Sequence, residues 1–125
     1  MDKTVLIVDD EEINRELFCQ ILNTRGYDML EADSGVQAIE VVQSKKPDLI
    51  LLDLFMPNGD GMSVLQAVRG NPETKDIPIV VVTAAVNDDV LKKTQELGCN
   101  ALVRKPVDMQ LLLSTVDQLL TSDNG

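Results

Sequence analysis

Four short, continuous runs of apolar residues recur along the chain and are separated by longer, mostly polar segments. The runs cover residues 5–8, 49–52, 79–82 and 101–103. A strand that is apolar at every position is covered on both faces, which is typical of a parallel sheet. The segment 27–32 alternates more between apolar and polar residues and suits a strand nearer an edge. The sequence therefore predicts five strands.

Between these runs, apolar residues recur at the three- and four-residue spacing of amphipathic helices, and we expect them to face the core. They are Ile13, Leu17, Ile21 and Leu22; Ala38, Ile39 and Val42; Met62, Leu65 and Val68; Val90, Leu91 and Leu97; Leu112, Val116, Leu119 and Leu120. Ser34 and Asn87 precede two of these helical patterns as N-caps. Gly26, Gly70 and Gly98 follow three of them, where a left-handed residue is common.

A strict alternation of strand and helix predicts an α/β fold with right-handed crossovers. We expect a doubly wound, flavodoxin-like (βα)5 domain whose parallel sheet has the order 2-1-3-4-5. In such sheets the ligand crevice lies outside the carboxyl ends of strands 1 and 3. The chain of 125 residues has room for a single domain, with a core at about 4–120 and a flexible tail at 121–125.

Charge and composition exclude several classes of function. With 21 acidic and 11 basic residues, the net charge of −10 repels nucleic acids and anionic membranes alike. The chain contains no histidine, which excludes histidine-dependent triads and histidine-ligated zinc. Cys19 and Cys99 are eighty positions apart, so we expect buried free thiols. No apolar stretch approaches the roughly 18 residues of a membrane span, and we expect a cytoplasmic protein.

Polar side chains stand where the predicted strands end, and these ends meet at one edge of a parallel sheet. They are Asp9 and Asp10 after the first run, Asp53 after 49–52, Thr83 after 79–82, and Arg104 and Lys105 after 101–103. Two strands, or about 10 Å, separate Asp53 from Lys105, and a lysine side chain about 6 Å long nearly closes that gap.

Three converging carboxylates repel one another, so either their pKa values rise or a cation lies among them. Oxygen ligands without histidine or cysteine favour Mg²⁺. A carboxylate beside Mg²⁺, with a lysine and a threonine, suits aspartyl-phosphate chemistry. Taken singly, Asp9 and Asp10 also suit helix N-cap acids and Lys105 a solvated surface lysine. The combination favours a phosphorylation site.

The joint pattern resembles the receiver domain of two-component response regulators over residues 4 to about 120. The residues that carry the resemblance are Asp9-Asp10, Asp53, Met56-Pro57, Gly61, Thr83-Ala84 and Lys105-Pro106.

The resemblance implies a role for each of these positions. Asp53 would be the phosphoacceptor, Asp10 a direct Mg²⁺ ligand and Asp9 a ligand through water, while the backbone carbonyl of Phe55 would complete the metal site. Mn²⁺ can substitute for Mg²⁺. The resemblance also implies that Thr83, Ala84 and Lys105 contact the phosphoryl group or move with it. It further implies a cis peptide bond before Pro106.

The resemblance also implies a signalling switch rather than a free-standing enzyme. A histidine kinase or phosphotransferase in a phosphorelay would donate the phosphoryl group, and the domain would assist its own phosphotransfer and slow dephosphorylation. The fourth helix, fifth strand and fifth helix would then bind a downstream protein, an output domain or a second copy of the chain. The extra apolar residues Val107, Leu111 and Leu113 suit either such a surface or a wide core face. We expect either a stand-alone regulator or the receiver piece of a longer chain.

The sequence departs from the family pattern at two places. Leu102 stands where many receivers carry a Phe or Tyr that rotates on activation. Phe55 and Ala85 offer no polar group to an attacking water, which predicts a long-lived phosphorylated form. A haloacid-dehalogenase-like phosphatase would need an acid at position 55, and an interaction-only pseudo-receiver would have lost the acids that are intact here.

Overall fold

The computed structural model describes residues 3–54, 56, 61–84 and 87–121 and has the predicted architecture. The described residues form parallel strands β1 (Thr4–Val8), β2 (Asp28–Ala32), β3 (Leu49–Asp53), β4 (Ile79–Thr83) and β5 (Ala101–Arg104) in the order β2-β1-β3-β4-β5. The connecting helices are α1 (Glu12–Asn23), α2 (Gly35–Lys45), α3 (Gly61–Arg69), α4 (Asp88–Glu96) and α5 (Met109–Thr121). The predicted fold class and strand order are confirmed. None of these described helices has the length and apolar character needed to cross a bilayer.

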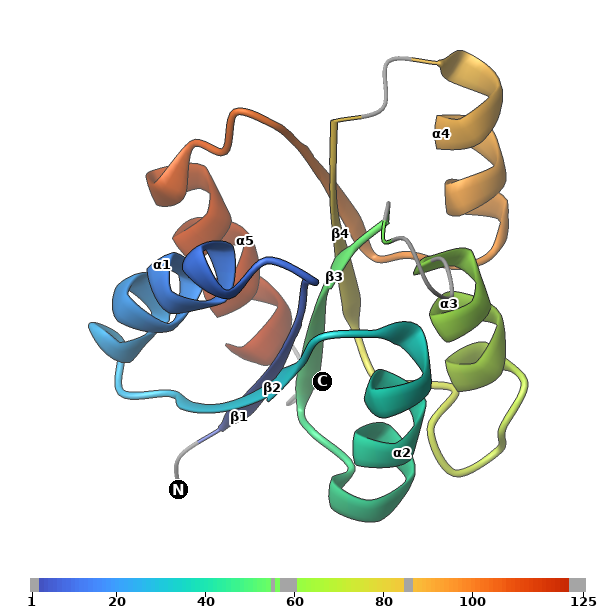
Figure 1. Cartoon of the computed structure of the whole chain (residues 1–125), viewed down its shortest axis with the longest axis horizontal. Helices are drawn as coiled ribbons and strands as arrows, with labels where there is room; N and C mark the ends of the chain where they lie inside the picture. The colour runs from blue at the N-terminus through green and yellow to red at the C-terminus, as the bar shows by residue number, and fades with distance from the viewer. Residues whose placement is uncertain (1–2, 55, 57–60, 85–86, 122–125) are drawn as a thin grey trace.

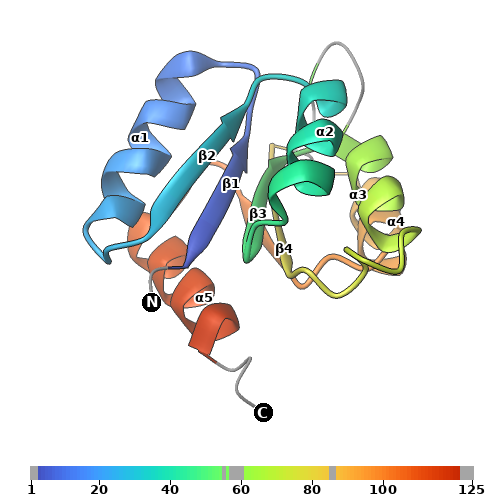
Figure 2. The same cartoon turned by 90° about the horizontal axis from the view of Figure 1, so that it is seen from below.

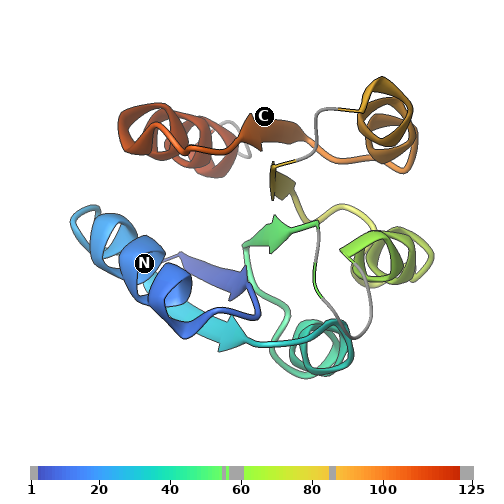
Figure 3. The same ribbon diagram turned by 45° about the horizontal axis from the view of Figure 1, so that its top comes forward.

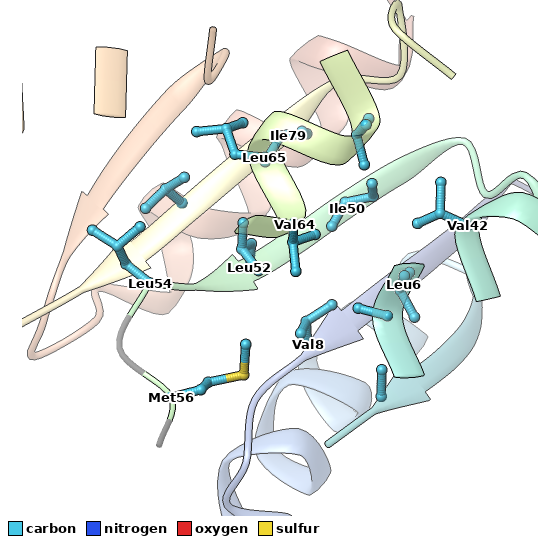
Figure 4. Packing of buried hydrophobic residues seen from close by; sticks show 14 residues of the cluster. Leu6, Val8, Val42, Ile50, Leu52, Leu54, Met56, Val64, Leu65 and Ile79 are labelled. Atoms are coloured by element: carbon cyan, nitrogen blue, oxygen red, sulfur yellow. The ribbon is translucent and has the colours of Figure 1, made fainter. Parts of the chain in front are cut away.

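The helices form two layers that cover both faces of the sheet. Helices α1 and α5 lie on one face, and α2, α3 and α4 lie on the other (Figures 1, 2 and 3). Successive strand residues point to opposite faces, so each continuous apolar run contributes to both layers. In β1, for example, Leu6 and Val8 pack against α2 and α3 (Figure 4), whereas Val5 and Ile7 pack against α1 and α5.

The core-facing side of α1 agrees with the prediction at Ile21 and Leu22 and differs from it at Ile13 and Leu17. Ile13 and Leu17 are 66% and 49% exposed, whereas Phe18 and Leu22 are buried. Both pairs are spaced four residues apart, but neighbouring residues on a helix point about 100° apart, so only one pair can face the sheet. Because α1 packs against β1, β2 and α5, the pair that faces the core is Phe18 and Leu22.

The helix ends follow the prediction at four positions and differ at one. The Ser34 hydroxyl and the Asn87 side-chain carbonyl accept hydrogen bonds from backbone N–H groups, as N-caps do. Gly26 and Gly98 have φ angles of +80° and +99°, as predicted. Gly70 does not have a positive φ angle, because the chain after α3 continues in right-handed turns.

The two cysteines are free thiols, as expected, and each is partly buried against the core. Burial raises the pKa of both thiols above the usual range. Burial therefore disfavours the reactive thiolate form of both cysteines.

Candidate functional site

The polar residues predicted to form a site all lie at the carboxyl edge of the sheet. Val8 of β1 pairs with Leu52 of β3, so Asp9 and Asp53, the residues that follow them, are at the same level of the sheet. Asp53 pairs with Val82, and Thr83 with Arg104, which brings the ends of β4 and β5 to that level too. The parallel register alone therefore gathers residues from four strands at one place.

Asp9, Asp10 and Asp53 form a compact cluster of carboxylates. One oxygen of each lies within 4.8 Å of the others. Asp9 and Asp53 are 1% and 7% exposed, while Asp10 is exposed to solvent. Three negative charges this close repel one another, and burial of two of them weakens the screening by water. The cluster is therefore a site at which a cation would be strongly favoured.

One carboxylate oxygen of Asp9 accepts no hydrogen bond from the described residues. Its Oδ1 accepts a hydrogen bond of 2.9 Å from the backbone N–H of Glu11. Its Oδ2 is buried and has no hydrogen-bond partner among the described residues. A buried carboxylate oxygen without a partner is costly unless a cation or an ordered water meets it. The oxygen-only ligand set and this free oxygen both fit Mg²⁺.

Lys105 reaches across β4 to the carboxylate of Asp53. Its Nζ lies 3.4 Å from Asp53 Oδ2, and its side chain is 30% exposed against 8% for Asp53. The backbone N–H of Lys105 donates a 2.9 Å hydrogen bond to the carbonyl of Thr83. The backbone of Lys105 therefore lies beside the carboxyl end of β4. The Lys105–Pro106 peptide bond is cis. A cation held against Asp53 can later pair with any anionic group that this carboxylate carries.

Gly61 brings the start of α3 against the end of β3. A Cβ atom at this position would lie 2.7 Å from the Asp53 carbonyl oxygen and 2.7 Å from Leu54 Cα, closer than real Cβ atoms approach. The N–H of Gly61 also donates a 2.9 Å hydrogen bond to the Leu54 carbonyl. Only glycine therefore permits this approach, which holds the backbone of the central aspartate in place.

Of the other predicted residues, some lie in this region and some lie outside the described part of the chain. Met56 is 6% exposed, belongs to the same core cluster as Val8 and Leu54, and extends toward Val8 (Figure 4). Thr83 is buried and Ala84 is exposed. Phe55, whose carbonyl was the expected fourth metal ligand, is not among the described residues, and neither are Pro57 and Ala85.

Sequence reasoning missed one residue that contacts the site. Arg15 of α1 donates a 2.8 Å hydrogen bond from Nη1 to the backbone carbonyl of Asp9, and its Nε lies 3.0 Å from Glu31 Oε1. The sequence offered only a weak signal for it, an arginine one and a half helical turns after the paired acids. Charged residues are common on exposed helix faces, so the spacing did not distinguish Arg15 from its neighbours.

Comparison with known proteins finds similar chains in both sequence and fold. The family model described as the response regulator receiver domain matches residues 5–117. The polar-differentiation response regulator DivK of Brucella ovis is 31% identical over 120 residues, which cover 96% of this chain and 98% of that protein.

Two solved structures have the same arrangement of strands and helices. The chemotaxis protein CheY4 of Vibrio cholerae matches with a TM-score of 0.89 at 28% identity, covering 96% of this chain and 100% of that one. The receiver domain of the sensor histidine kinase PA1611 of Pseudomonas aeruginosa was solved with a magnesium ion coordinated in its active-site cleft. It shares the fold with a TM-score of 0.88 at 23% identity, covering 97% and 99% of the two chains.

Proposed function

The chain belongs to the response regulator receiver domain family, and we propose that it is a phosphorylation-dependent switch whose phosphoacceptor is Asp53. Receiver domains are signalling domains of two-component systems. The observation that carries the proposal is the carboxylate cluster of Asp9, Asp10 and Asp53 with Lys105 Nζ 3.4 Å from Asp53 Oδ2. A histidine kinase or phosphotransferase supplies the phosphoryl group, since the chain has no histidine of its own.

Phosphoryl transfer at this site needs positioning and charge neutralisation more than a base. An Asp53 carboxylate oxygen forms the new O–P bond while the N–P bond of the donor's phosphohistidine breaks, and the imidazole nitrogen leaves with the electron pair. Asp10 and Asp53, with Asp9 acting through water and with the carbonyl of Phe55, would hold Mg²⁺, which would supply charge neutralisation for the transferring group. Lys105, already beside Asp53, pairs with a phosphoryl oxygen. Mn²⁺ takes the same oxygen ligands.

Thr83 and Ala84 link the site to the surface through α4. Thr83 is the last residue of β4, and the chain runs from Ala84 into the Asn87 cap of α4. We infer that the Thr83 hydroxyl and the backbone at Ala84 contact phosphoryl oxygens once Asp53 is modified. A movement at this point shifts the chain that enters α4, so α4 is the first helix to respond.

The output surface in this proposal consists of α4, β5 and α5. The extra apolar residues near α5 divide between core and surface, because Leu113 is 7% exposed whereas Leu111 is 54% exposed. Val107 packs against the core from its edge, and Leu102 of β5 is partly buried. We propose that a downstream protein, an output domain or a second copy of the chain binds this surface. With Leu102 in place of an aromatic residue, the coupling runs through Thr83 and the loop after it.

Acetyl phosphate and peptide mapping test the site itself. We expect the protein with MgCl2 to gain one phosphoryl group, and borohydride reduction to convert Asp53 to homoserine. In excess EDTA the reaction should be at least about 100-fold slower, because the incoming phosphoryl group then meets uncompensated carboxylates. A phosphoryl group on Thr83, or transfer at the same rate in EDTA, would show that the proposed chemistry is wrong.

Amide hydrogen exchange tests the output surface. With Mg²⁺ and beryllofluoride as a phosphoryl analogue, we expect altered protection across residues 84–113, since the loop from Thr83 carries the change to α4 and its neighbours. The same protein with Mg²⁺ alone is the control. Changes confined to the strand ends around Asp53 would refute this route.

A further inference from the structure

We propose that Arg15 is a positioning residue for the metal site, because its hydrogen bond to the Asp9 carbonyl directs the Asp10 carboxylate toward Asp53. The inference rests on the proposed Mg²⁺ site. It concerns a residue that touches neither the phosphoryl group nor the metal. Arg15 lies on α1, and its guanidinium reaches back to the residue that leaves β1.

The backbone of Asp9 is held on both sides. Its N–H donates a 3.1 Å hydrogen bond to the Ala32 carbonyl at the end of β2, and its C=O accepts the 2.8 Å bond from Arg15 Nη1. Because the Asp9 carbonyl belongs to the planar peptide unit that leads into Asp10, fixing that carbonyl fixes the direction in which the chain continues. Asp10 is exposed and follows β1, so its carboxylate is directed by the two peptide units that flank it. The Arg15 bond holds the first of them, and the bond from Glu11 N–H to Asp9 Oδ1 holds the second.

Arg15 is itself held in one orientation. Its Nε lies 3.0 Å from Glu31 Oε1, and its side chain is only 16% exposed. The planar guanidinium uses two nitrogens for two partners, Glu31 on β2 and the Asp9 carbonyl after β1. A lysine has one ammonium nitrogen on a flexible stem and cannot reproduce this two-point contact. The arginine therefore ties the ends of β1 and β2 together through α1.

Positioning and simple electrostatics predict opposite effects on Mg²⁺ binding. A positive charge near the cluster would repel a divalent cation, so its removal would tighten binding. Glu31 neutralises much of that charge at 3.0 Å, which leaves the geometric effect of the hydrogen bond as the larger one. We therefore expect loss of Arg15 to weaken Mg²⁺ binding.

Calorimetric titration with MgCl2 of the parent, Arg15→Met, Arg15→Lys and Arg25→Met proteins tests the inference. Both Arg15 variants should bind Mg²⁺ about tenfold more weakly, as loss of an outer partner of a metal ligand usually does. Arg15→Lys keeps the charge and most of the stem, so it remains informative if Arg15→Met folds poorly. Arg25→Met is the matched control, because it removes an arginine paired with Asp117 beyond the other end of α1. Its Mg²⁺ affinity should match that of the parent.

The outcomes separate this inference from the proposed function. If the parent does not bind Mg²⁺, the proposed function is wrong. If the parent binds Mg²⁺ and both Arg15 variants bind it equally well or more tightly, only the positioning role of Arg15 is wrong. A lower melting temperature with unchanged affinity would likewise overturn it, because Arg15 would then support the fold alone.

Discussion

Replacing Asp53 with Asn is expected to lower the rate of phosphorylation by acetyl phosphate at least about 1,000-fold, with no loss of folding. The neutral amide keeps the size and shape of the carboxylate but is a very poor nucleophile toward phosphorus, so the O–P bond cannot form at a useful rate. Asp53 lies among Asp9, Asp10 and Lys105, and no other described carboxylate has these partners. Phosphate incorporation, followed by intact mass, measures the effect.

The matched control for this variant is Asp28→Asn. Asp28 is an exposed acid at the first position of β2, at the opposite edge of the sheet from the site, and its loss should leave the rate unchanged. A circular dichroism melt should show that both variants fold. Residual phosphorylation of Asp53→Asn above about one tenth of the parent rate would mean that another residue accepts the group.

Replacing Asp10 with Asn is expected to change metal affinity and stability in opposite directions. Loss of a charged ligand should weaken Mg²⁺ binding at least about 100-fold, since loss of an outer-shell partner alone costs 10–100-fold. Without metal, the same change removes one of three carboxylates that lie within 4.8 Å of one another. Because Asp10 is exposed, relief of this repulsion should raise the free energy of unfolding by about 1 kcal/mol.

Urea unfolding with EDTA and with saturating MgCl2 separates the two effects. In EDTA the Asp10→Asn variant should be more stable than the parent, and in MgCl2 the order should reverse, because the parent gains the binding free energy of the ion. Asp28→Asn, which removes an exposed acid at the opposite end of β2 from the site, should behave like the parent in both conditions. If Asp10→Asn bound Mg²⁺ as tightly as the parent, Asp10 would not be a metal ligand.

The sequence by itself determined the strands, their parallel direction and the edge of the sheet at which the acids gather. Continuous apolar runs can only be covered on both faces, and alternation with helices forces parallel strands whose carboxyl ends share one edge. Asp9, Asp53 and Lys105 therefore had to lie at one edge of the sheet, and the strand order β2-β1-β3-β4-β5 then places them near one another. The caps at Ser34 and Asn87 were also predictable, because capping is a local interaction between residues close in the chain.

Only the tertiary structure decided which face of α1 is buried and which residues support the site. Ile13–Leu17 and Phe18–Leu22 have the same spacing, and the choice between them depends on where α5 and the sheet edge lie. The contact of Arg15 with the Asp9 carbonyl depends on the angle at which the chain turns from β1 into α1.

Arg69, at the end of α3, is the clearest example of a residue whose contacts only the tertiary structure determines. Its guanidinium donates hydrogen bonds of 2.7–2.9 Å to the carbonyls of Lys75, Ile77 and Gly98 and to the side-chain oxygen of Asn100. Desolvation by burial lowers the pKa of this guanidinium, which still remains charged. Its partners lie as far as 31 positions away, so no local pattern could reveal them. A periodic pattern records which residues are apolar, whereas a polar contact between distant segments exists only once the fold has brought them together.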